Sequence, residues 1–301
     1  MNDASIVVTG LSKKYLGATG YAIKDISLHV NAGESYGFLG PNGAGKSTTI
    51  RTLLNFIQPT AGSATILGAD IVKNAVAVKK DIGYLSGEFA VYPKMTGHDY
   101  LRYMSALQPA TSETYVKTLI NKFKAEPDKK LGELSRGNKQ KFGIIQAFMH
   151  QPKVVILDEP SSGLDPLMQE AFYELIAEAK QRGAAIFMSS HILSEVQKTC
   201  DRVGIVRDGV LVEERIMAQM VNEAAQIFDI TFATKVPLTE LKKISGAKLV
   251  NTKGQSVTLH MHGNLSQLFK VLASYDVTKI DTKTLDLDEM FMGFYENKGK
   301  K

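Results

Sequence analysis

The spacing of hydrophobic and polar residues divides most of the chain into alternating strand-like and helix-like segments. Residues 26–40 alternate apolar and polar positions around a turn at Asn31–Gly33, so the region 5–40 is expected to form strands and turns. Unbroken apolar runs at 153–158 and 184–190 are typical of strands that are buried on both faces of a parallel sheet. Strands that alternate with helices predict a largely parallel α/β fold.

Three segments between these strands show the spacing of amphipathic helices. The first begins at Lys46 and should end before Pro59, and the second region covers 96–123. The third begins after Asp165, which is suited to be its N-cap, with Pro166 at the first helical position. Its expected buried stripe is Met168, Ala171, Phe172, Leu175, Ile176 and Ala179.

Near residue 220 the pattern changes to that of a small α+β domain. Residues 217–226 predict a linking helix, after which half-buried strands alternate with helical runs. The strands are expected at 227–232, 247–252 and 256–261, and the helical runs at 238–244, 264–274 and 286–295. We therefore expect one domain over 1–220 and a smaller domain over 225–301.

Composition adds few constraints on function. The net charge of +5 permits contact with a membrane surface or nucleic acid, but no basic stripe with interleaved aromatics is present, so no nucleic-acid partner is expected. A single cysteine, Cys200, excludes an internal disulfide and favours a reducing cytoplasm. The sequence shows no signal peptide and no apolar run near the ~18 residues of a membrane span, so another chain is expected to provide any span.

Residues 40–48, GPNGAGKST, fit the phosphate-loop pattern G-x-x-x-x-G-K-[ST]. The candidate nucleotide-binding residues are Gly40, Pro41, Asn42, Gly43, Ala44, Gly45, Lys46, Ser47 and Thr48. The glycines allow the backbone to curl around a phosphate with its N–H groups pointing inward. Lys46 adds a positive charge, and the Ser47 hydroxyl is a candidate magnesium ligand.

Two acids follow the buried strand at 153–158. The carboxyl end of such a strand lies at the same sheet edge as the phosphate loop, so Asp158 is expected to hold Mg²⁺. Glu159, one residue later, would orient or deprotonate an attacking water. Without the phosphate loop, a solvated strand end would be an equally good interpretation of this pair.

A polar octet at 134–141, LSRGNKQK, stands at the head of a predicted helix. A helix N-terminus presents unpaired N–H groups and the positive end of the helix dipole, so it is suited to bind an anion. Ser135 is equally suited to be the N-cap of this helix, and the residues alone leave both interpretations open.

These motifs occur in a specific order. The phosphate loop is followed by the octet, the strand that ends in Asp158, the stretch SSGLD at 161–165, and an isolated histidine, His191, in SSHILSE. The set resembles the ATP-binding subunit of ABC transporters, of the bacterial drug and bacteriocin exporter type, over about residues 5–215. The resemblance implies a P-loop NTPase core with an antiparallel β subdomain and a helical subdomain at about 88–150, with ATP and Mg²⁺ as cofactors.

In this family two ATPase domains meet head to tail, and each ATP lies between one phosphate loop and the partner's octet. The resemblance thus implies that Ser135, Arg136, Gly137 and Asn138 face ATP held by a second ATPase subunit, and a homodimer is expected. Roles that the resemblance implies for single residues are adenine stacking for Tyr15, catalysis for Glu159 and His191, and an inter-subunit loop for Asp165. Tyr15 is also compatible with an ordinary half-buried tyrosine.

Two positions depart from the family pattern. Arg136 stands where the family usually has the first of two glycines, and its side chain would either point to solvent or add charge near the phosphates. Gly87 stands where the family usually has a glutamine that contacts Mg²⁺. Either Glu88 supplies an oxygen ligand instead, or this contact is missing.

The resemblance also implies a separate integral membrane permease as partner, and it implies that this chain lies at the cytoplasmic face of the cell membrane as a peripheral subunit. Its docking site is expected on the helical segment 96–125 and on the preceding loop, with Phe89, Val91 and Tyr92 exposed. In its length of about 300 residues, its octet and its tail LDLDEMFMGFY, the chain resembles ATPases of bacterial exporters. The alternative is an ABC-type ATPase that acts on ribosomes or DNA, but such proteins usually carry two cassettes or a long coiled-coil insertion. A GTPase would need an Asn-Lys-x-Asp loop, which the sequence lacks.

Overall fold

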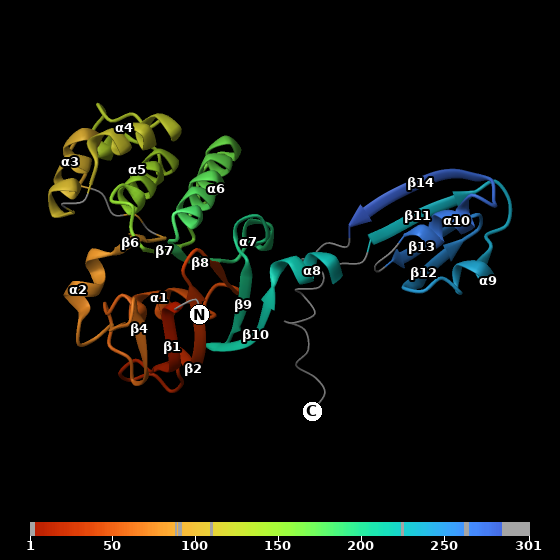
Figure 1. Ribbon diagram of the computed structural model, residues 1–301, viewed down its shortest axis with the longest axis horizontal. Coiled ribbons are helices and arrows are strands. Elements are labelled where there is room, and N and C mark those ends of the chain that lie inside the picture. Colours follow the sequence, from red (N-terminus) through yellow and green to blue (C-terminus); the bar gives the residue numbers. More distant parts are fainter. Residues whose placement is uncertain are drawn as a thin grey trace. The chain divides into compact units, whose positions relative to one another are not determined.

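A computed structural model describes the protein at residues 4–87, 89, 92–108, 111–223, 226–261 and 265–284. The chain divides into two compact units, residues 1–215 and residues 216–301. Figure 1 shows their strands and helices.

A six-stranded, largely parallel sheet carries the functional residues of the first unit. Its strand order is β10-β9-β3-β8-β7-β6. The strands are β3 (Ser35–Leu39), β6 (Ile82–Leu85), β7 (Val154–Asp158), β8 (Ala185–Ser190), β9 (Arg202–Arg207) and β10 (Val210–Ile216). Every residue of β3, β7 and β8 is buried, as the unbroken apolar runs predicted for β7 and β8.

The register of this sheet brings three strand ends together. Leu39 of β3 pairs with Ser190 of β8, and Asp158 of β7 pairs with Ser189 of β8. The segments that follow β3, β7 and β8 therefore leave the same edge of the sheet at the same level. This is the edge where ligands bind in open α/β sheets.

An antiparallel sheet forms the second layer of this unit. Its strands are β1 (Ala4–Lys13), β2 (Ile23–Asn31), β4 (Ala61–Ile66) and β5 (Ala69–Asp70), in the order β2-β1-β4-β5. One hydrophobic cluster joins Ile6 and Val30 of this sheet with Ile50 of helix α1 (Lys46–Leu53) and Phe187 of the parallel sheet. The core therefore holds the helix that follows the phosphate loop between the two sheets.

Four of the six remaining helices described in this unit begin after a residue whose side chain caps the helix. The six are α2 (Ala75–Lys80), α3 (Gly97–Leu107), α4 (Glu113–Lys122), α5 (Arg136–Phe148), α6 (Pro166–Gln181) and α7 (Leu193–Thr199), with a 3₁₀ turn, η1, at Leu131–Glu133. Before α3, α4, α5 and α6, Thr96, Ser112, Ser135 and Asp165 each accept a hydrogen bond from a backbone N–H three residues later. Helix α1 begins at Lys46 as predicted but ends at Leu53, earlier than the expected stop before Pro59.

The described part of the second unit is a four-stranded antiparallel sheet with two short helices, α9 (Leu238–Leu241) and α10 (Ser266–Leu272), preceded by the helix α8 (Met217–Glu223). Its elements are α8, β11 (Gln226–Phe232), α9, β12 (Ala247–Lys253), β13 (Ser256–Met261), α10 and β14 (Val277–Thr284). The strand order β12-β13-β11-β14 and the sequence β-α-β-β-α-β define a split βαβ arrangement. Phe228, Ile230, Val257 and Leu259 form the centre of its core.

Strand β14 was not predicted from the sequence. It lies at the edge of the sheet and pairs only with β11, and Thr278, Lys279, Ile280 and Asp281 are all exposed. An edge strand with so few buried positions lacks the hydrophobic alternation on which the prediction depended. The helix expected at 286–295 lies outside the described residues.

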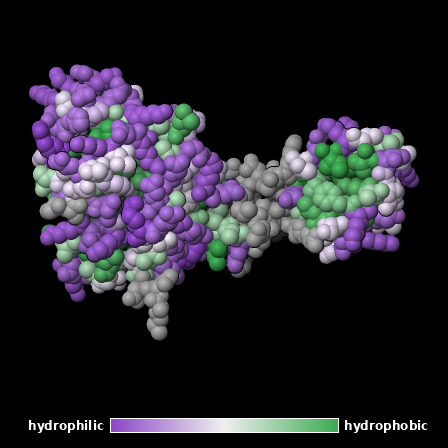
Figure 2. Space-filling view, turned by 45° about the horizontal axis from the view of Figure 1, so that its top comes forward, coloured by the Kyte–Doolittle hydropathy of each residue, from purple (hydrophilic) through white to green (hydrophobic). Residues whose placement is uncertain are grey.

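The second unit also presents apolar surface. Figure 2 shows hydrophobic side chains gathered on the visible face of this unit. Val250, Phe269 and Ile280 are among its exposed large hydrophobic residues. Across the described parts of the chain, no helix is long and apolar enough to cross a membrane.

The buried thiol of Cys200 gives a direct test of this fold. Cys200 lies after α7, against the hydroxyl of Ser35 on β3, and burial raises the pKa of the thiol to about 11. Only the thiolate attacks thiol reagents, so we expect no labelling at pH 8 in the folded protein and one equivalent in denaturant.

The same burial predicts a pH effect on stability. The unfolded thiol ionises near pH 8.5, whereas the folded one ionises near pH 11, so the free energy of unfolding should fall as pH rises through this window. Rapid labelling of the native protein at pH 8 would contradict the buried position.

Candidate functional site

The phosphate loop joins β3 to α1 in a conformation that needs glycine. Gly43 and Gly45 have φ of 82° and 104°, in the left-handed region that side chains disfavour. At Gly40 a Cβ atom would lie 2.4 Å from the carbonyl oxygen of Val206, so only glycine fits. The loop therefore curls at the N-terminus of α1, as the motif predicts.

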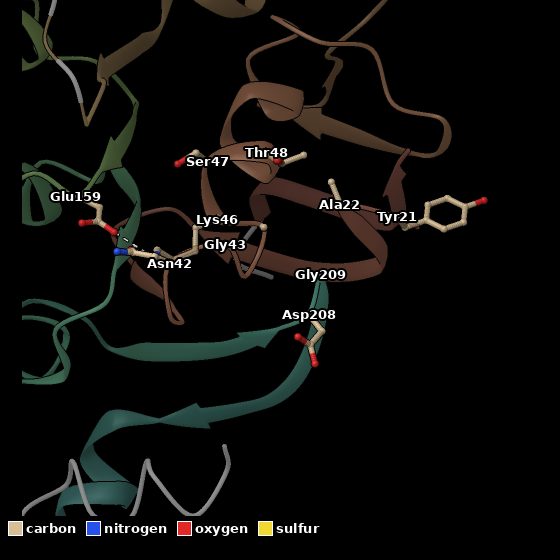
Figure 3. A pocket seen from close by; sticks show the side chains of 11 residues that line it. Tyr21, Ala22, Asn42, Gly43, Lys46, Ser47, Thr48, Glu159, Asp208 and Gly209 are labelled. Atoms are coloured by element: carbon tan, nitrogen blue, oxygen red, sulfur yellow. Dashed lines mark ion pairs between the residues drawn. The ribbon is translucent and has the colours of Figure 1, made fainter. Parts of the chain in front are cut away.

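Lys46 is the first residue of α1, and its side chain is buried. Its Nζ donates to the carbonyl oxygens of Gly40 at 2.8 Å and Pro41 at 3.2 Å. Its third contact is an ion pair of 3.2 Å with Oε1 of Glu159. Figure 3 shows this pair as a dashed line beside the loop. A buried ammonium needs such partners, because an unpaired buried charge is strongly destabilising.

Glu159 follows β7 directly and is held at both ends of its carboxylate. Oε2 lies 2.8 Å from Nδ1 of His191, opposite the contact of Oε1 with Lys46. The backbone of Glu159 has φ of 49°, a conformation that costs on the order of 1–3 kcal/mol outside glycine. Its N–H donates to the carbonyl oxygen of Ser189 at 3.1 Å, which helps to hold this conformation.

Asp158 is the last residue of β7 and is almost fully buried. Its Oδ1 accepts a hydrogen bond of 2.5 Å from the hydroxyl of Ser189. Asp158, Ser47 and Glu159 line one open cavity of about 400 Å³ together with Gly87 and Arg136. Carboxylate and hydroxyl oxygens are the ligands that Mg²⁺ prefers, so Asp158 and Ser47 fit this ion.

No cluster of three or more His, Cys, Asp or Glu side chains that could hold a metal occurs among the described residues. Mg²⁺ does not require such a cluster. This ion is usually bound through one or two protein ligands together with substrate phosphates and water.

Gly87 lies beside Asp158. A Cβ atom built on Gly87 would lie 3.3 Å from the backbone oxygen of Asp158 and 3.8 Å from its Cγ. Tyr84, in the preceding strand, lines the same cavity, and burial and the charge of Asp158 raise the pKa of its hydroxyl. Glu88, the alternative ligand, lies outside the described residues.

The octet at 134–141 begins α5, and its residues are tied to the loop after Glu159. Ser135 is the N-cap, and its hydroxyl accepts from the N–H of Asn138 at 3.3 Å. Arg136 donates to the hydroxyl of Ser162 at 3.0 Å. A Cβ atom at Gly137 would lie 2.3 Å from the carbonyl oxygen of Gly163, so this contact requires glycine.

A second cavity, of about 450 Å³, lies along the other side of the phosphate loop. Sequence reasoning missed four of its lining residues: Tyr21, Ala22, Asp208 and Gly209. In Figure 3 the Tyr21 ring extends away from the other labelled side chains. Asp208 and Gly209 form the turn between β9 and β10, and an Asp-Gly pair is a turn signal without functional meaning by itself.

Tyr15 lies near the phosphate loop but does not line this cavity. Its side chain is 40% exposed, and its hydroxyl lies 3.5 Å from Oγ1 of Thr48. Asp165 caps α6 through a hydrogen bond of 3.0 Å from the N–H of Met168. The structure thus gathers the phosphate loop, Asp158, Glu159 and His191 at one place, and Ser135 and Asp165 each act as a helix cap.

The fold and this arrangement define a P-loop ATPase. A comparison with known families matches the ABC transporter family over residues 23–162. The bacitracin transport ATP-binding protein BcrA of Bacillus licheniformis is 37% identical over 212 residues, which are 69% of this chain and 69% of BcrA. The ABC transporter ATP-binding protein YcbN of Bacillus subtilis is 29% identical over 297 residues, 95% of both chains.

A solved structure of an ATP-binding subunit of an ABC transporter is also similar. It superposes with a TM-score of 0.66 and 29% identity, over 71% of this chain and 91% of that one. The chain belongs to the ABC transporter family, as an ATP-binding and ATP-hydrolysing subunit that energises a separate permease. The alternative of a non-transport ABC-type ATPase is not favoured.

The contact between Gly137 and Gly163 can be tested by adding one methyl group. Gly137→Ala should force α5 away from the loop at 163, because the backbone oxygen cannot move aside as a side chain can. We expect the free energy of unfolding in urea to fall by about 1–3 kcal/mol. Gly20→Ala is the matched control, since nothing lies within 4 Å of that position. Equal stability of the two variants would show that α5 does not press on this loop.

Proposed function

We propose that this subunit hydrolyses ATP at the junction with a second copy of the same chain, and that the resulting cycle drives a permease that exports a drug-like or peptide substrate. One observation carries the proposal: the Glu159 carboxylate is held between Lys46 and His191 beside the phosphate loop. The acid, the phosphate-binding cation and the histidine come from three separate strand ends, and they meet at a single point.

ATP binding would rearrange the partners of Lys46. A phosphate in the loop carries more negative charge than Glu159 and reaches Lys46 through charge-assisted hydrogen bonds, so it competes with Glu159 for the ammonium. Glu159 then keeps its contact with His191 and is free to accept a proton from an attacking water. His191, whose side chain is 47% exposed, would contact the γ-phosphate.

Asp158 and Ser47 would hold Mg²⁺ at this site. When bound, the ion neutralises charge on the phosphate oxygens. The hydrogen bond from Ser189 fixes the orientation of the Asp158 carboxylate, which is how outer partners tune metal ligands. Tyr15, beside Thr48, is the residue that we assign to stack on adenine.

The octet can bind a phosphate of the ATP held by a second copy, even though Ser135 is also the N-cap of α5. A serine hydroxyl can accept and donate at once, so Ser135 can accept from Asn138 and still donate its proton to a phosphate. The N–H groups at the start of α5 add to this anion site, and Gly137 keeps the approach open. Asp165 and the loop before it would cross toward the second copy, with Arg136 anchored on Ser162.

The permease is expected to dock on the helical part of the first unit, at about 88–150. Tyr92 and Tyr103 are half-exposed there, with ring centroids 6.0 Å apart. Phe89, by contrast, was expected to be exposed but packs edge-on against Tyr100. Val91 lies outside the described residues. Docking at this surface would place the subunit at the cytoplasmic face of the membrane, and the likeness to a bacitracin transport protein supports an exporter.

The junction of two copies predicts dimerisation that depends on ATP. Glu159→Gln should block hydrolysis, so that ATP and Mg²⁺ convert the full chain from monomer to dimer in light scattering. Ser135→Arg in the same background should still bind ATP but stay monomeric, because the larger side chain fills the anion site. An ATP-bound Glu159→Gln variant that remains monomeric would contradict self-assembly through the octet.

Gly87 predicts a loosely held metal. Gly87→Gln should place an amide oxygen toward the metal held by Asp158, once a small shift relieves the 3.3 Å contact of the new Cβ atom with the backbone oxygen of Asp158. We expect Mn²⁺, used as a spectroscopic probe for Mg²⁺, to bind the ATP complex about tenfold more tightly, as an added metal partner can provide.

The measurement is an electron paramagnetic resonance titration of Mn²⁺ in the presence of ATP. Asp158→Asn serves as the variant with weakened binding. An unchanged Mn²⁺ affinity in Gly87→Gln would show that position 87 does not reach the metal.

A further inference from the structure

A buried acid that no motif identifies lies behind the catalytic pair. Glu195 is in the first turn of α7, and only 3% of its side chain is exposed. Among the other buried charged groups of this unit, Glu34 pairs with Arg202 at 2.9 Å, Lys46 pairs with Glu159, and Asp158 accepts a hydrogen bond from Ser189. Within the described part of the chain, Glu195 forms no ion pair.

The contacts of Glu195 join it to the segment that carries His191. Its Oε2 accepts a hydrogen bond of 2.6 Å from the hydroxyl of Ser190, the residue directly before His191. The same hydroxyl accepts from the N–H of Ile192 at 3.0 Å. The Ser190 side chain therefore connects the Glu195 carboxylate to the backbone N–H of Ile192. Ser190 and Ile192 directly precede and follow His191, so these two hydrogen bonds hold the backbone on both sides of the histidine.

The surroundings of Glu195 also connect it to Glu159. Burial is the main cause that raises the pKa of the Glu195 carboxyl, and the negative charge of Glu159 raises it further. The hydroxyls of Ser190 and Ser161 and the charge of His191 act in the opposite direction. Ser161 lies two residues after Glu159, and Ser190 lies directly before His191. Glu195 therefore interacts with both of the segments that carry the catalytic pair.

Other groups near Glu195 are neutral at physiological pH. They are the Tyr173 hydroxyl on α6, whose pKa is raised to about 12 by burial and by Glu195, and the buried Cys200 thiol. Among the described residues, the second carboxylate oxygen, Oε1, has no hydrogen-bond partner. A buried carboxyl with one unsatisfied oxygen is less favourable than an apolar residue at the same position. Glu195 therefore lowers the stability of the folded protein.

We propose that Glu195 is a positioning residue that fixes His191 against Glu159 through the hydroxyl of Ser190. The inference rests on the proposed roles of Glu159 and His191. With the Ser190 hydroxyl held, the backbone at 190–192 has one arrangement, and Nδ1 of His191 stays within 2.8 Å of the Glu159 carboxylate. Without that anchor, His191 keeps its chemistry but loses its fixed position, and a loss of orientation lowers the rate of the chemical step more than substrate affinity.

The test compares Glu195→Ala, which removes the acceptor, with Glu195→Gln, which keeps a carbonyl oxygen for Ser190. The first readout is the imidazole signal of His191 in ¹H–¹³C spectra of the full chain, assigned with a His191→Gln variant. The second is steady-state ATP hydrolysis, as kcat and KM. Glu170→Gln is the control, because Glu170 is an exposed acid of α6 that pairs with Lys198, away from Ser190 and His191 in the contacts of the described residues.

We expect Glu195→Ala to shift the His191 signal and lower kcat at least tenfold, with KM changed less than threefold. Glu195→Gln should restore the His191 signal and return kcat to within about threefold of the unmodified protein, and Glu170→Gln should match it. If Glu195→Ala does not fold, Ser190→Ala removes the other half of the same hydrogen bond and is expected to give the same two changes.

An unchanged His191 signal in Glu195→Ala would overturn the proposal, whatever the effect on hydrolysis. So would a Glu195→Gln variant that is as impaired as Glu195→Ala. The spectroscopic readout needs no turnover. The outcome that separates the two proposals combines two variants: the His191 signal shifts in Glu195→Ala, but His191→Gln hydrolyses ATP at an unchanged rate. This outcome would refute the proposed role of His191 and leave the structural role of Glu195 intact.

Discussion

The buried ammonium of Lys46 is the charge around which the site is organised. It begins the helix that follows the phosphate loop, it is held by two loop carbonyls, and its remaining partner is Glu159 from a different strand. The register of the parallel sheet makes this meeting possible, because Leu39 and Asp158 pair with consecutive residues of β8. Any shift of one strand against the others would separate the cation from the acid.

A chain of contacts extends from Lys46 into the rest of the first unit. Glu159 also pairs with His191, and the hydroxyl of Ser190, the residue before His191, donates to the buried Glu195 on α7. On the other side, the loop after Glu159 supports the octet through the contacts of Arg136 with Ser162 and of Gly137 with Gly163. Direct contacts within one chain therefore connect Glu159, where ATP would be cleaved, to the octet, which would contact a second copy.

Local signals in the sequence predicted the parts of this site that depend on local chemistry. The phosphate loop, the buried strand before Asp158 and the cap at Asp165 each follow from a few neighbouring residues, and the structure forms all three. Glu195, Tyr21 and the contact between Gly137 and Gly163 could not be predicted, because each depends on segments that only the tertiary fold brings together. Strand β14 was missed for a related reason, since an edge strand is defined by its partner and has little hydrophobic pattern of its own.

The central claim is that a phosphate replaces Glu159 as the partner of Lys46 and that the octet of a second copy completes the site. The most direct measurement is a crystal structure of the unmodified full chain with Mg²⁺ and a non-hydrolysable ATP analogue. The account predicts Lys46 Nζ on the phosphates, Glu159 still beside His191 but apart from Lys46, and the hydroxyl of Ser135 from a second copy at the γ-phosphate. A nucleotide bound with the Lys46–Glu159 pair intact, or with no octet facing it, would contradict the account.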